Sequence, residues 1–242
     1  MRTIWSLIYG VIYVLYTVPF LKKARKLEST QLTRKEYNQK VHRIPKRFGR
    51  QFFKQSGSKM IIKGEANIPD GPYLIVGNHQ SYYDIFAYLG YFKDPFGFIS
   101  KIEVSKIPIV RPWMKVMDCL FLDREDRRQS VKTFKNGIQL LEGGHPIAIF
   151  PEGTRSLGRE MLSFQSGSFN LARKAKVPVL PVMIDGTHKI LEDNHNRIKK
   201  ATVYMTICDP ISVDEVEQMS LDELAEETQR RIQEALDDVK VR

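Results

Sequence analysis

The chain has 242 residues, 42% of them hydrophobic, and a formal net charge of +10. This size suits one domain, or one domain with an appendage, around a sizeable core. Its two cysteines, Cys119 and Cys208, lie far apart in apolar runs, which excludes a disulfide framework and a cysteine metal site and indicates buried thiols in a reducing compartment.

The positive charge is concentrated at the N-terminal end. Residues 1–54 hold 13 Lys and Arg against 2 acids, a balance of +11, whereas the remaining 188 residues hold 25 against 26, a balance of −1. The body therefore lacks a basic patch, and it shows no nucleic-acid recognition motif, so nucleic acid is not an expected partner. We predict N-terminal membrane-associating helices over residues 1–56 and an α/β domain over residues 57–242.

Residues 4–21 carry no charge and predict a helix of roughly 27 Å, just short of a typical hydrocarbon core. Its aromatic residues recur at helical steps and predict a stripe on one face, formed by Trp5, Tyr9, Tyr13, Tyr16 and Phe20. Four basic residues follow directly, namely Lys22, Lys23, Arg25 and Lys26.

Two membrane arrangements of this helix are open: a single span with its C-terminal end in the cytoplasm, or a helix lying in one leaflet. Both predict association with the cytoplasmic face of the cell membrane. The residues expected to contact the membrane are Trp5, Tyr9, Tyr13, Lys22, Lys23, Arg25 and Lys26. A cleaved signal peptide is disfavoured because most of the positive charge follows the apolar run. A core helix is the remaining alternative.

Residues 34–54 predict a second basic amphipathic helix, or a pair of helices broken near Pro45. The apolar residues recur at helical spacing on one face, at Tyr37, Val41, Ile44, Phe48 and Phe52. Such a helix suits an anionic membrane surface, although a solvated charged face has the same pattern.

From residue 60 onward, strands alternate with helices, which predicts a mostly parallel or mixed central sheet covered by helices on both faces. Short apolar runs predict strands over residues 60–62, 73–77, 96–100, 119–122, 146–150, 177–184 and 202–207. Amphipathic stretches predict helices over residues 82–89, 107–117, 128–141, 169–176 and 221–239.

A histidine and an aspartate arrive together after the strand predicted over residues 73–77, as His79-x4-Asp84. On a continuous helix their side chains would point about 140° apart, so the pair requires a turn with Asp84 in the first turn of the next helix. A carboxylate that holds a histidine makes it a good general base. The simpler alternative is a structural histidine beside a helix-capping aspartate.

Further polar groups follow the other predicted strands: Lys101, Arg124, and the pair Glu152 and Arg155. If the strands are parallel, these groups share one edge of the sheet with His79. Three converging cations suit a phosphate, and Gly153 would let the backbone approach closely. Each residue alone is an ordinary surface charge, but the set at successive strand ends favours a site.

The sequence offers no clear covalent nucleophile. Ser81 lies inside the histidine motif without the G-x-S-x-G elbow, and Ser156 is typical of a surface turn. A histidine base here would therefore activate a hydroxyl brought by the substrate. The scattered His145, His188 and His195 give no metal-ligand spacing, so no metal is expected.

Four ordered blocks resemble those of the glycerolipid acyltransferases, most closely the bacterial 1-acylglycerol-3-phosphate acyltransferases. The blocks are Asn78-His79-x4-Asp84, then Arg124 after an apolar strand, then Phe150-Pro151-Glu152-Gly153-Thr154-Arg155-Ser156, then Val177-Pro178-Val179-Leu180-Pro181-Val182. The resemblance covers about residues 58–210. One departure is Asp123, directly before Arg124.

The resemblance implies acyl transfer from acyl-CoA or acyl-acyl carrier protein to the 2-hydroxyl of lysophosphatidic acid, giving phosphatidic acid for phospholipid synthesis. It implies no cofactor and no acyl-enzyme, with His79 as base and Asp84 orienting it. The acceptor phosphate and glycerol would be bound by Lys101, Arg124, Glu152, Gly153, Thr154 and Arg155. Val179 and Pro181 are expected to shape the acyl or acceptor pocket.

Alternatives remain open at this stage. Within the transferases, the acceptor is another lysophospholipid or glycerol 3-phosphate. In another class, a lipid hydrolase would use the same base on water. In a third, the chain is a membrane-binding module without catalysis that uses its basic N-terminal helices.

Overall fold

In the computed structural model, which describes residues 2–240, seven strands form one sheet in the order β1-β7-β6-β2-β5-β3-β4. The strands are β1 Lys59–Lys63, β2 Leu74–Gly77, β3 Gly97–Lys101, β4 Leu120–Leu122, β5 Ile147–Ile149, β6 Val179–Asp185 and β7 Thr202–Ile207. Five neighbours from β6 to β4 run parallel, whereas β7 is antiparallel to β6 and β1 is parallel to β7. The predicted mixed, mostly parallel sheet is confirmed; residues 1, 241 and 242 of the two predicted regions lie outside the described chain.

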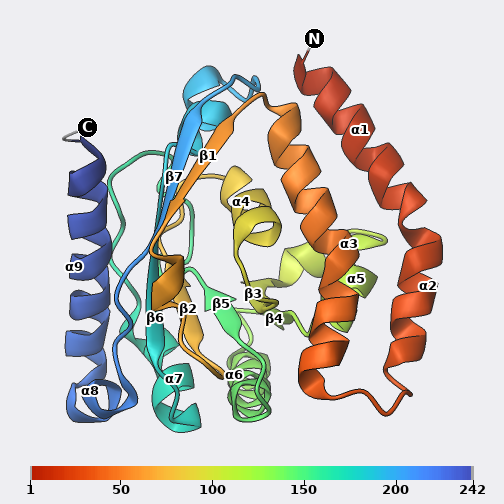
Figure 1. Ribbon diagram of the computed structural model, residues 1–242. Helices are drawn as coiled ribbons and strands as arrows, with labels where there is room; N and C mark the ends of the chain where they lie inside the picture. Colours follow the sequence, from red (N-terminus) through yellow and green to blue (C-terminus); the bar gives the residue numbers. More distant parts are fainter. Residues whose placement is uncertain (1, 241–242) are drawn as a thin grey trace.

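Helices cover both faces of the sheet (Figure 1). The α-helices of the described chain are α1 Arg2–Tyr16, α2 Val18–Leu27, α3 Arg34–Gln55, α4 Tyr83–Tyr91, α5 Val110–Val116, α6 Arg127–Glu142, α7 Asn170–Ala175, α8 Val213–Gln218 and α9 Leu221–Lys240, and α1 packs on the outside of α3 rather than on the sheet. Strand side chains alternate between two cores. Ile75 points into the core shared with α2 to α5, and Leu74 and Val76 point into the core shared with α6 to α9.

The helix predicted over residues 4–21 is broken, so that prediction is wrong. α1 ends at Tyr16, and α2 begins at Val18 with Pro19 in its first turn, where the missing N–H of proline is tolerated. No single helix within residues 2–240 is long and apolar enough to cross a bilayer; α1 and α2 together have the length and composition, with a bend of 45° between them.

α3 is one continuous helix through Pro45, so a pair of helices is excluded. Thr33 and Glu36 form a reciprocal capping box at its start. Its apolar face packs on α4, and the two backbones cross at Gly49 and Gly90, where a Cβ on Gly49 would lie only 2.8 Å from the Gly90 nitrogen. α3 therefore belongs to the same core as the sheet, although the predicted boundary at residue 56 falls after its end.

The middle of the aromatic stripe, Tyr9 and Tyr13, faces α3 rather than solvent, whereas Trp5 and Tyr16 are exposed. Tyr13 stacks on Phe48 with 5.0 Å between ring centroids, and the Tyr9 hydroxyl donates to Gln51 Oε1 at 2.8 Å. The expectation that Tyr9 and Tyr13 contact the membrane is therefore corrected for this arrangement. The exposed face of α1 is mainly aliphatic and is formed by Ile4, Trp5, Leu7, Ile8, Val11, Ile12, Leu15 and Tyr16.

A buried polar cluster joins α3 to the amino ends of the parallel strands. The two ring nitrogens of His42 lie 2.9 and 2.7 Å from the carbonyl oxygens of Asn38 and Phe96. The Asn38 amide nitrogen lies 2.9 Å from Nδ1 of His145. Burial, with repulsion from His42 and Arg34, lowers the pKa of His145 to about 3. His145 is therefore neutral in the folded chain at neutral and mildly acid pH.

We predict that acid destabilises the fold through this cluster. His145 has an ordinary pKa of 6.5 when unfolded, so below pH 6.5 the unfolded chain binds the proton first. Stability is complete above that pH, and the free energy of unfolding falls by about 1.5 kcal/mol between pH 6.5 and pH 5 on this account. Urea unfolding at both pH values measures it. His145→Asn, which keeps an acceptor for Asn38, is expected to flatten the dependence; an unchanged slope would contradict the assignment.

Candidate active site

The predicted site residues gather at the carboxyl edge of the five parallel strands. His79 follows β2, Lys101 is the last residue of β3, Arg124 follows β4, and Glu152 and Arg155 follow β5. Parallel strands end at the same edge of a sheet, where open α/β folds place their ligands. The sheet thus brings together loops that are far apart in sequence.

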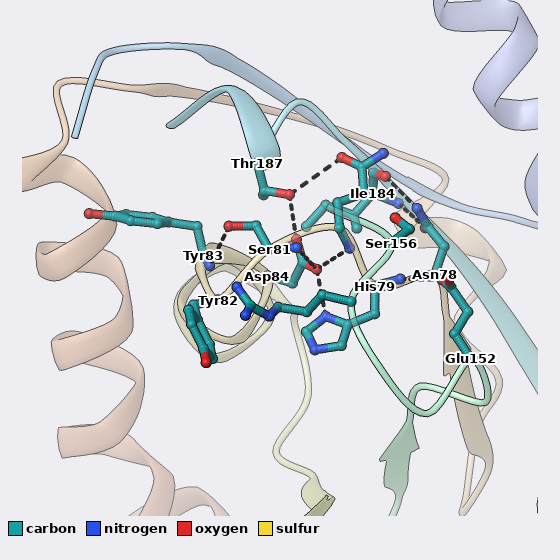
Figure 2. Close-up of polar contacts among 12 residues, drawn as sticks. Asn78, His79, Ser81, Tyr82, Tyr83, Asp84, Glu152, Ser156, Ile184 and Thr187 are labelled. Atoms are coloured by element: carbon teal, nitrogen blue, oxygen red, sulfur yellow. Dashed lines mark hydrogen bonds and ion pairs between the residues drawn. The ribbon is translucent and has the colours of Figure 1, made fainter. Parts of the chain in front are cut away.

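His79 and Asp84 are in direct contact across the turn that joins β2 to α4 (Figure 2). Nδ1 of His79 lies 2.7 Å from Oδ2 of Asp84, and the carboxylate is fully buried in the first turn of α4. The same oxygen accepts the backbone N–H groups of Gln80 and Ser81 at 2.7 and 2.9 Å. Asp84 therefore fixes the shape of the turn as well as the histidine ring.

The end of β6 supports this turn through contacts that sequence reasoning missed. The Asn78 side-chain amide exchanges two hydrogen bonds of 2.8 Å with the backbone of Ile184. The Gln80 amide oxygen accepts the Gly186 N–H at 3.0 Å, and the Thr187 hydroxyl donates to Oδ1 of Asp84. Asn78 belongs to the first sequence block, whereas the only sequence signal of Gln80 and Thr187 is that they are polar residues beside a strand end.

The ring of His79 is held in one orientation. It stacks on Phe150, with ring centroids 4.3 Å apart and planes 13° apart, and its side chain is 15% exposed. Because Asp84 accepts the proton of Nδ1, the neutral ring carries its lone pair on Nε2. Nε2 has no hydrogen-bond partner within residues 2–240, so it is free to take a proton from a bound molecule.

Glu152 joins the third block to the histidine turn. It is buried, and its two carboxylate oxygens accept the N–H of His79 at 2.6 Å and that of Leu162 at 2.8 Å. In return, Ser156 N–H donates to the carbonyl of His79 at 2.8 Å. Burial raises the pKa of Glu152, against the lowering effect of these bonds. Binding of a substrate hydroxyl by Glu152 stays a prediction, because both oxygens here hold backbone.

Arg124 lies directly over Gly153. A Cβ on Gly153 would stand 2.6 Å from Nη1 of Arg124 and would displace the end of that flexible side chain, and the glycine has φ of +74°, a backbone conformation that favours glycine. Asp123, the departure from the family pattern, shapes the preceding turn by accepting the N–H groups of Glu125 and Asp126. Arg124 itself is exposed at the carboxyl edge.

Arg155 lies between an aromatic ring and a carboxylate. Its guanidinium carbon is 3.5 Å from the ring centroid of Tyr82, and Nη1 donates to Oε1 of Glu192 at 2.7 Å. The Tyr82 N–H donates to the same glutamate oxygen at 3.3 Å. One N–H direction of the guanidinium is thus occupied, and the rest of its donors remain for a ligand.

The other predicted site residues form no side-chain hydrogen bond with His79 or Arg155 in the described chain. Lys101 and Thr154 are exposed at the same edge, without a polar side-chain contact to His79 or Arg155. Val179 and Pro181 are buried within β6 and pair with Leu74 and Val76 of β2. They form part of the sheet itself, so a role in a pocket stays a prediction.

The remaining nucleophile and metal candidates do not converge on His79. Ser81 Oγ accepts the Tyr83 N–H at 3.0 Å, and Ser156 Oγ donates to the Gly158 carbonyl at 2.9 Å. Burial raises the pKa of Cys119 to about 12 and that of Cys208 to about 11, so both thiols stay protonated. Residues 2–240 contain no group of three or more His, Cys, Asp or Glu placed to hold a metal ion.

Comparison with known proteins points to one family. Residues 59–185 match the Acyltransferase family model. The chain is 28% identical over 186 residues to a 1-acyl-sn-glycerol-3-phosphate acyltransferase of Saccharomyces cerevisiae, covering 76% of this chain and 61% of that protein. It is 36% identical over 182 residues to the chloroplastic 1-acyl-sn-glycerol-3-phosphate acyltransferase LPAT1 of Arabidopsis thaliana, covering 74% and 49%.

A solved structure is similar over the whole fold. The crystal structure of the 1-acyl-sn-glycerophosphate acyltransferase PlsC from Thermotoga maritima matches with a TM-score of 0.80 at 28% identity, covering 100% of this chain and 99% of that one. The chain spans about half to three-fifths of the length of the two curated relatives above. The chain belongs to the acyltransferase family, because the family model covers more than half of it.

We predict that Glu152→Gln loosens the two joined loops. An amide offers one acceptor oxygen where the carboxylate offers two, and its NH2 group would face a backbone N–H. The free energy of unfolding is expected to fall by about 1–3 kcal/mol, together with activity. Denaturant unfolding measures the change. Unchanged stability with a raised acceptor Michaelis constant would instead favour direct substrate binding by Glu152.

Proposed function

We propose that the chain transfers an acyl group from a thioester to the 2-hydroxyl of 1-acyl-glycerol 3-phosphate, giving phosphatidic acid. One observation carries this proposal: His79, oriented by a buried Asp84 at 2.7 Å, has a free Nε2 at the edge where Arg124 and Arg155 lie. The names of the relatives support the same reaction.

In the proposed reaction, Nε2 of His79 takes the proton of the 2-hydroxyl as that oxygen attacks the thioester carbonyl. Asp84 stabilises the imidazolium that forms. The tetrahedral intermediate then collapses with cleavage of the carbon–sulfur bond, and the imidazolium returns its proton to the leaving thiolate. Atoms and charges balance without a cofactor.

Direct transfer without an acyl-enzyme is supported by the surroundings of the histidine. A protein nucleophile must reach its base within hydrogen-bond distance. Ser81, inside the histidine turn, and Ser156, whose N–H donates to the His79 carbonyl, have their hydroxyls engaged with backbone groups, and both thiols are kept protonated by burial. The hydroxyl of the acceptor is therefore the nucleophile in this proposal.

The acceptor phosphate is assigned to Arg155 and Arg124, with Lys101 nearby on the same edge. Arginine binds phosphate through paired N–H groups, and Arg155 has donors left beyond its bond to Glu192. A phosphomonoester carries more charge than a phosphodiester, which favours lysophosphatidic acid over other lysophospholipids. The acyl donor in this proposal is acyl-CoA or acyl-acyl carrier protein.

We predict that His79→Ala lowers the turnover number by at least about 100-fold, because general-base catalysis is worth 10²–10⁴-fold. The assay incubates purified protein with lysophosphatidic acid and each thioester donor, and follows both free thiol and phosphatidic acid. Circular dichroism confirms that the variant is folded.

The same assay separates the alternative functions. Thiol release by the parent protein without phosphatidic acid would indicate a hydrolase that uses the base on water. No thioester turnover with any acceptor would indicate a binding module. Activity of His79→Ala within about tenfold of the parent would remove His79 as the base.

We further propose that the exposed aliphatic face of α1 rests in the cytoplasmic leaflet of the cell membrane. Solvent-exposed Ile4, Leu7, Val11 and Leu15 recur at helical spacing, and α2 and α3 add basic residues that attract anionic lipid. Both substrates carry acyl chains, so a site beside the bilayer gives them access.

We predict that Leu7→Asp with Val11→Asp weakens binding to vesicles containing anionic phospholipid by at least about tenfold, since each change places a charge on the inserted face. Vesicle co-sedimentation measures it. Val131→Asp on α6 is the matched control, because Val131 is 64% exposed, close to the 62% of Val11. Equal losses in all variants, or none in the double variant, would contradict the proposal.

A further inference from the structure

The chain segment that follows β6 contacts both halves of the candidate site. It enters at Thr187, runs through the short 3₁₀ helices His188–Ile190 and Glu192–Asn194, and is anchored by Ile190, which is fully buried. Thr187 donates a hydrogen bond to Asp84, the residue that holds His79, and Glu192 accepts one from Arg155 of the proposed phosphate site. Neither residue belongs to the four sequence blocks.

Thr187 completes the surroundings of the Asp84 carboxylate. The oxygen Oδ2 is shared by His79 and two backbone N–H groups, whereas Oδ1 accepts from the Thr187 hydroxyl. Without that hydroxyl, a fully buried carboxylate oxygen would lose its donor. The carboxylate would then be free to rotate away from the geometry that holds the histidine ring.

Glu192 fixes the long, flexible side chain of Arg155 in the phosphate site. Its side chain is 7% exposed and its Oε1 accepts both Arg155 Nη1 and the Tyr82 N–H. The face of Tyr82 supports the guanidinium from the other side. An arginine held in this way has already lost most of its rotamer freedom before a phosphate arrives.

We propose that this segment positions both halves of the site independently, Thr187 acting on the rate through Asp84 and Glu192 acting on acceptor affinity through Arg155. The inference rests on the proposed function and deepens it. Glu192 is a positioning residue and not a competitor of the phosphate, because it uses Nη1 and leaves the remaining donors of Arg155 for the ligand.

The test is a comparison of steady-state constants for the acceptor. Thr187→Val, which removes the hydroxyl at nearly constant size, is expected to lower kcat by about tenfold or more with KM within about twofold. Glu192→Ala is expected to raise the acceptor KM by about tenfold with kcat within about threefold. The two variants therefore move different constants.

Conservative variants and a neighbouring control separate positioning from folding. Thr187→Ser keeps the hydroxyl, and Glu192→Gln keeps an oxygen for Arg155 and Tyr82, so each is expected to recover most of its loss. Asp193→Ala removes the adjacent carboxylate, whose nearest basic group is His188 at 3.7 Å, and is expected to leave both constants unchanged. Thermal unfolding is recorded for every variant.

A double variant tests whether Glu192 acts through Arg155. Arg155→Ala alone is expected to raise the acceptor KM, and Arg155→Ala with Glu192→Ala is expected to be no worse. A fall in KM for Glu192→Ala, equal changes of both constants in the two single variants, or full additivity in the double variant would overturn the inference. Two other results bear on the proposed function instead. Failure of the parent protein to make phosphatidic acid would overturn it, and an unchanged acceptor KM in Arg155→Ala would remove Arg155 from the phosphate site.

Discussion

The buried carboxylate of Asp84 is the group around which the carboxyl edge of the sheet is arranged. It accepts hydrogen bonds from the histidine ring, from two backbone N–H groups of the turn and from the hydroxyl of Thr187. A charge without solvent needs such donors, because an ion left unpaired in the interior costs several kcal/mol. The same four bonds therefore compensate the buried charge, close the turn and orient the histidine ring, and none of these effects is available without the others.

The two loops that meet at His79 depend on each other for the same reason. The Glu152 carboxylate accepts the backbone N–H groups of His79 and Leu162, and the ring of Phe150 stacks on the ring of His79. The third sequence block, residues 150–156, thus contributes two different groups: Glu152 holds the backbone of the histidine turn, and Arg155 is the cation assigned to the ligand. This division of roles explains why a carboxylate lies beside residues assigned to an anionic substrate: most of its charge faces backbone donors rather than the ligand.

Sequence reasoning recovered the alternating α/β pattern, all seven strand positions to within about two residues, and the gathering of His79, Asp84, Arg124, Glu152 and Arg155 at one edge. It could do so because the spacing of hydrophobic residues, which distinguishes strands from helices, is read from neighbouring residues. The carboxyl ends of parallel strands also lie at the same edge of the sheet. It failed at the break near Pro19, at the direction of the tyrosine stripe and at Thr187 and Glu192. Those features depend on which surface packs opposite, and that is decided by contacts between residues up to about a hundred positions apart.

The crossing of α3 and α4 at Gly49 and Gly90 limits how the chain can be shortened. The two backbones touch there, and α4 carries Asp84 at its start. A fragment that begins after α3 would expose the apolar side of α4 to water. It would also lack Asn38, so the buried ring of His145 would lose this hydrogen-bond partner. A shortened form of this domain would therefore retain α3. If the outer face of α1 rests on lipid as proposed, a water-soluble form would carry polar residues on that face while keeping the packing of α3 on α4.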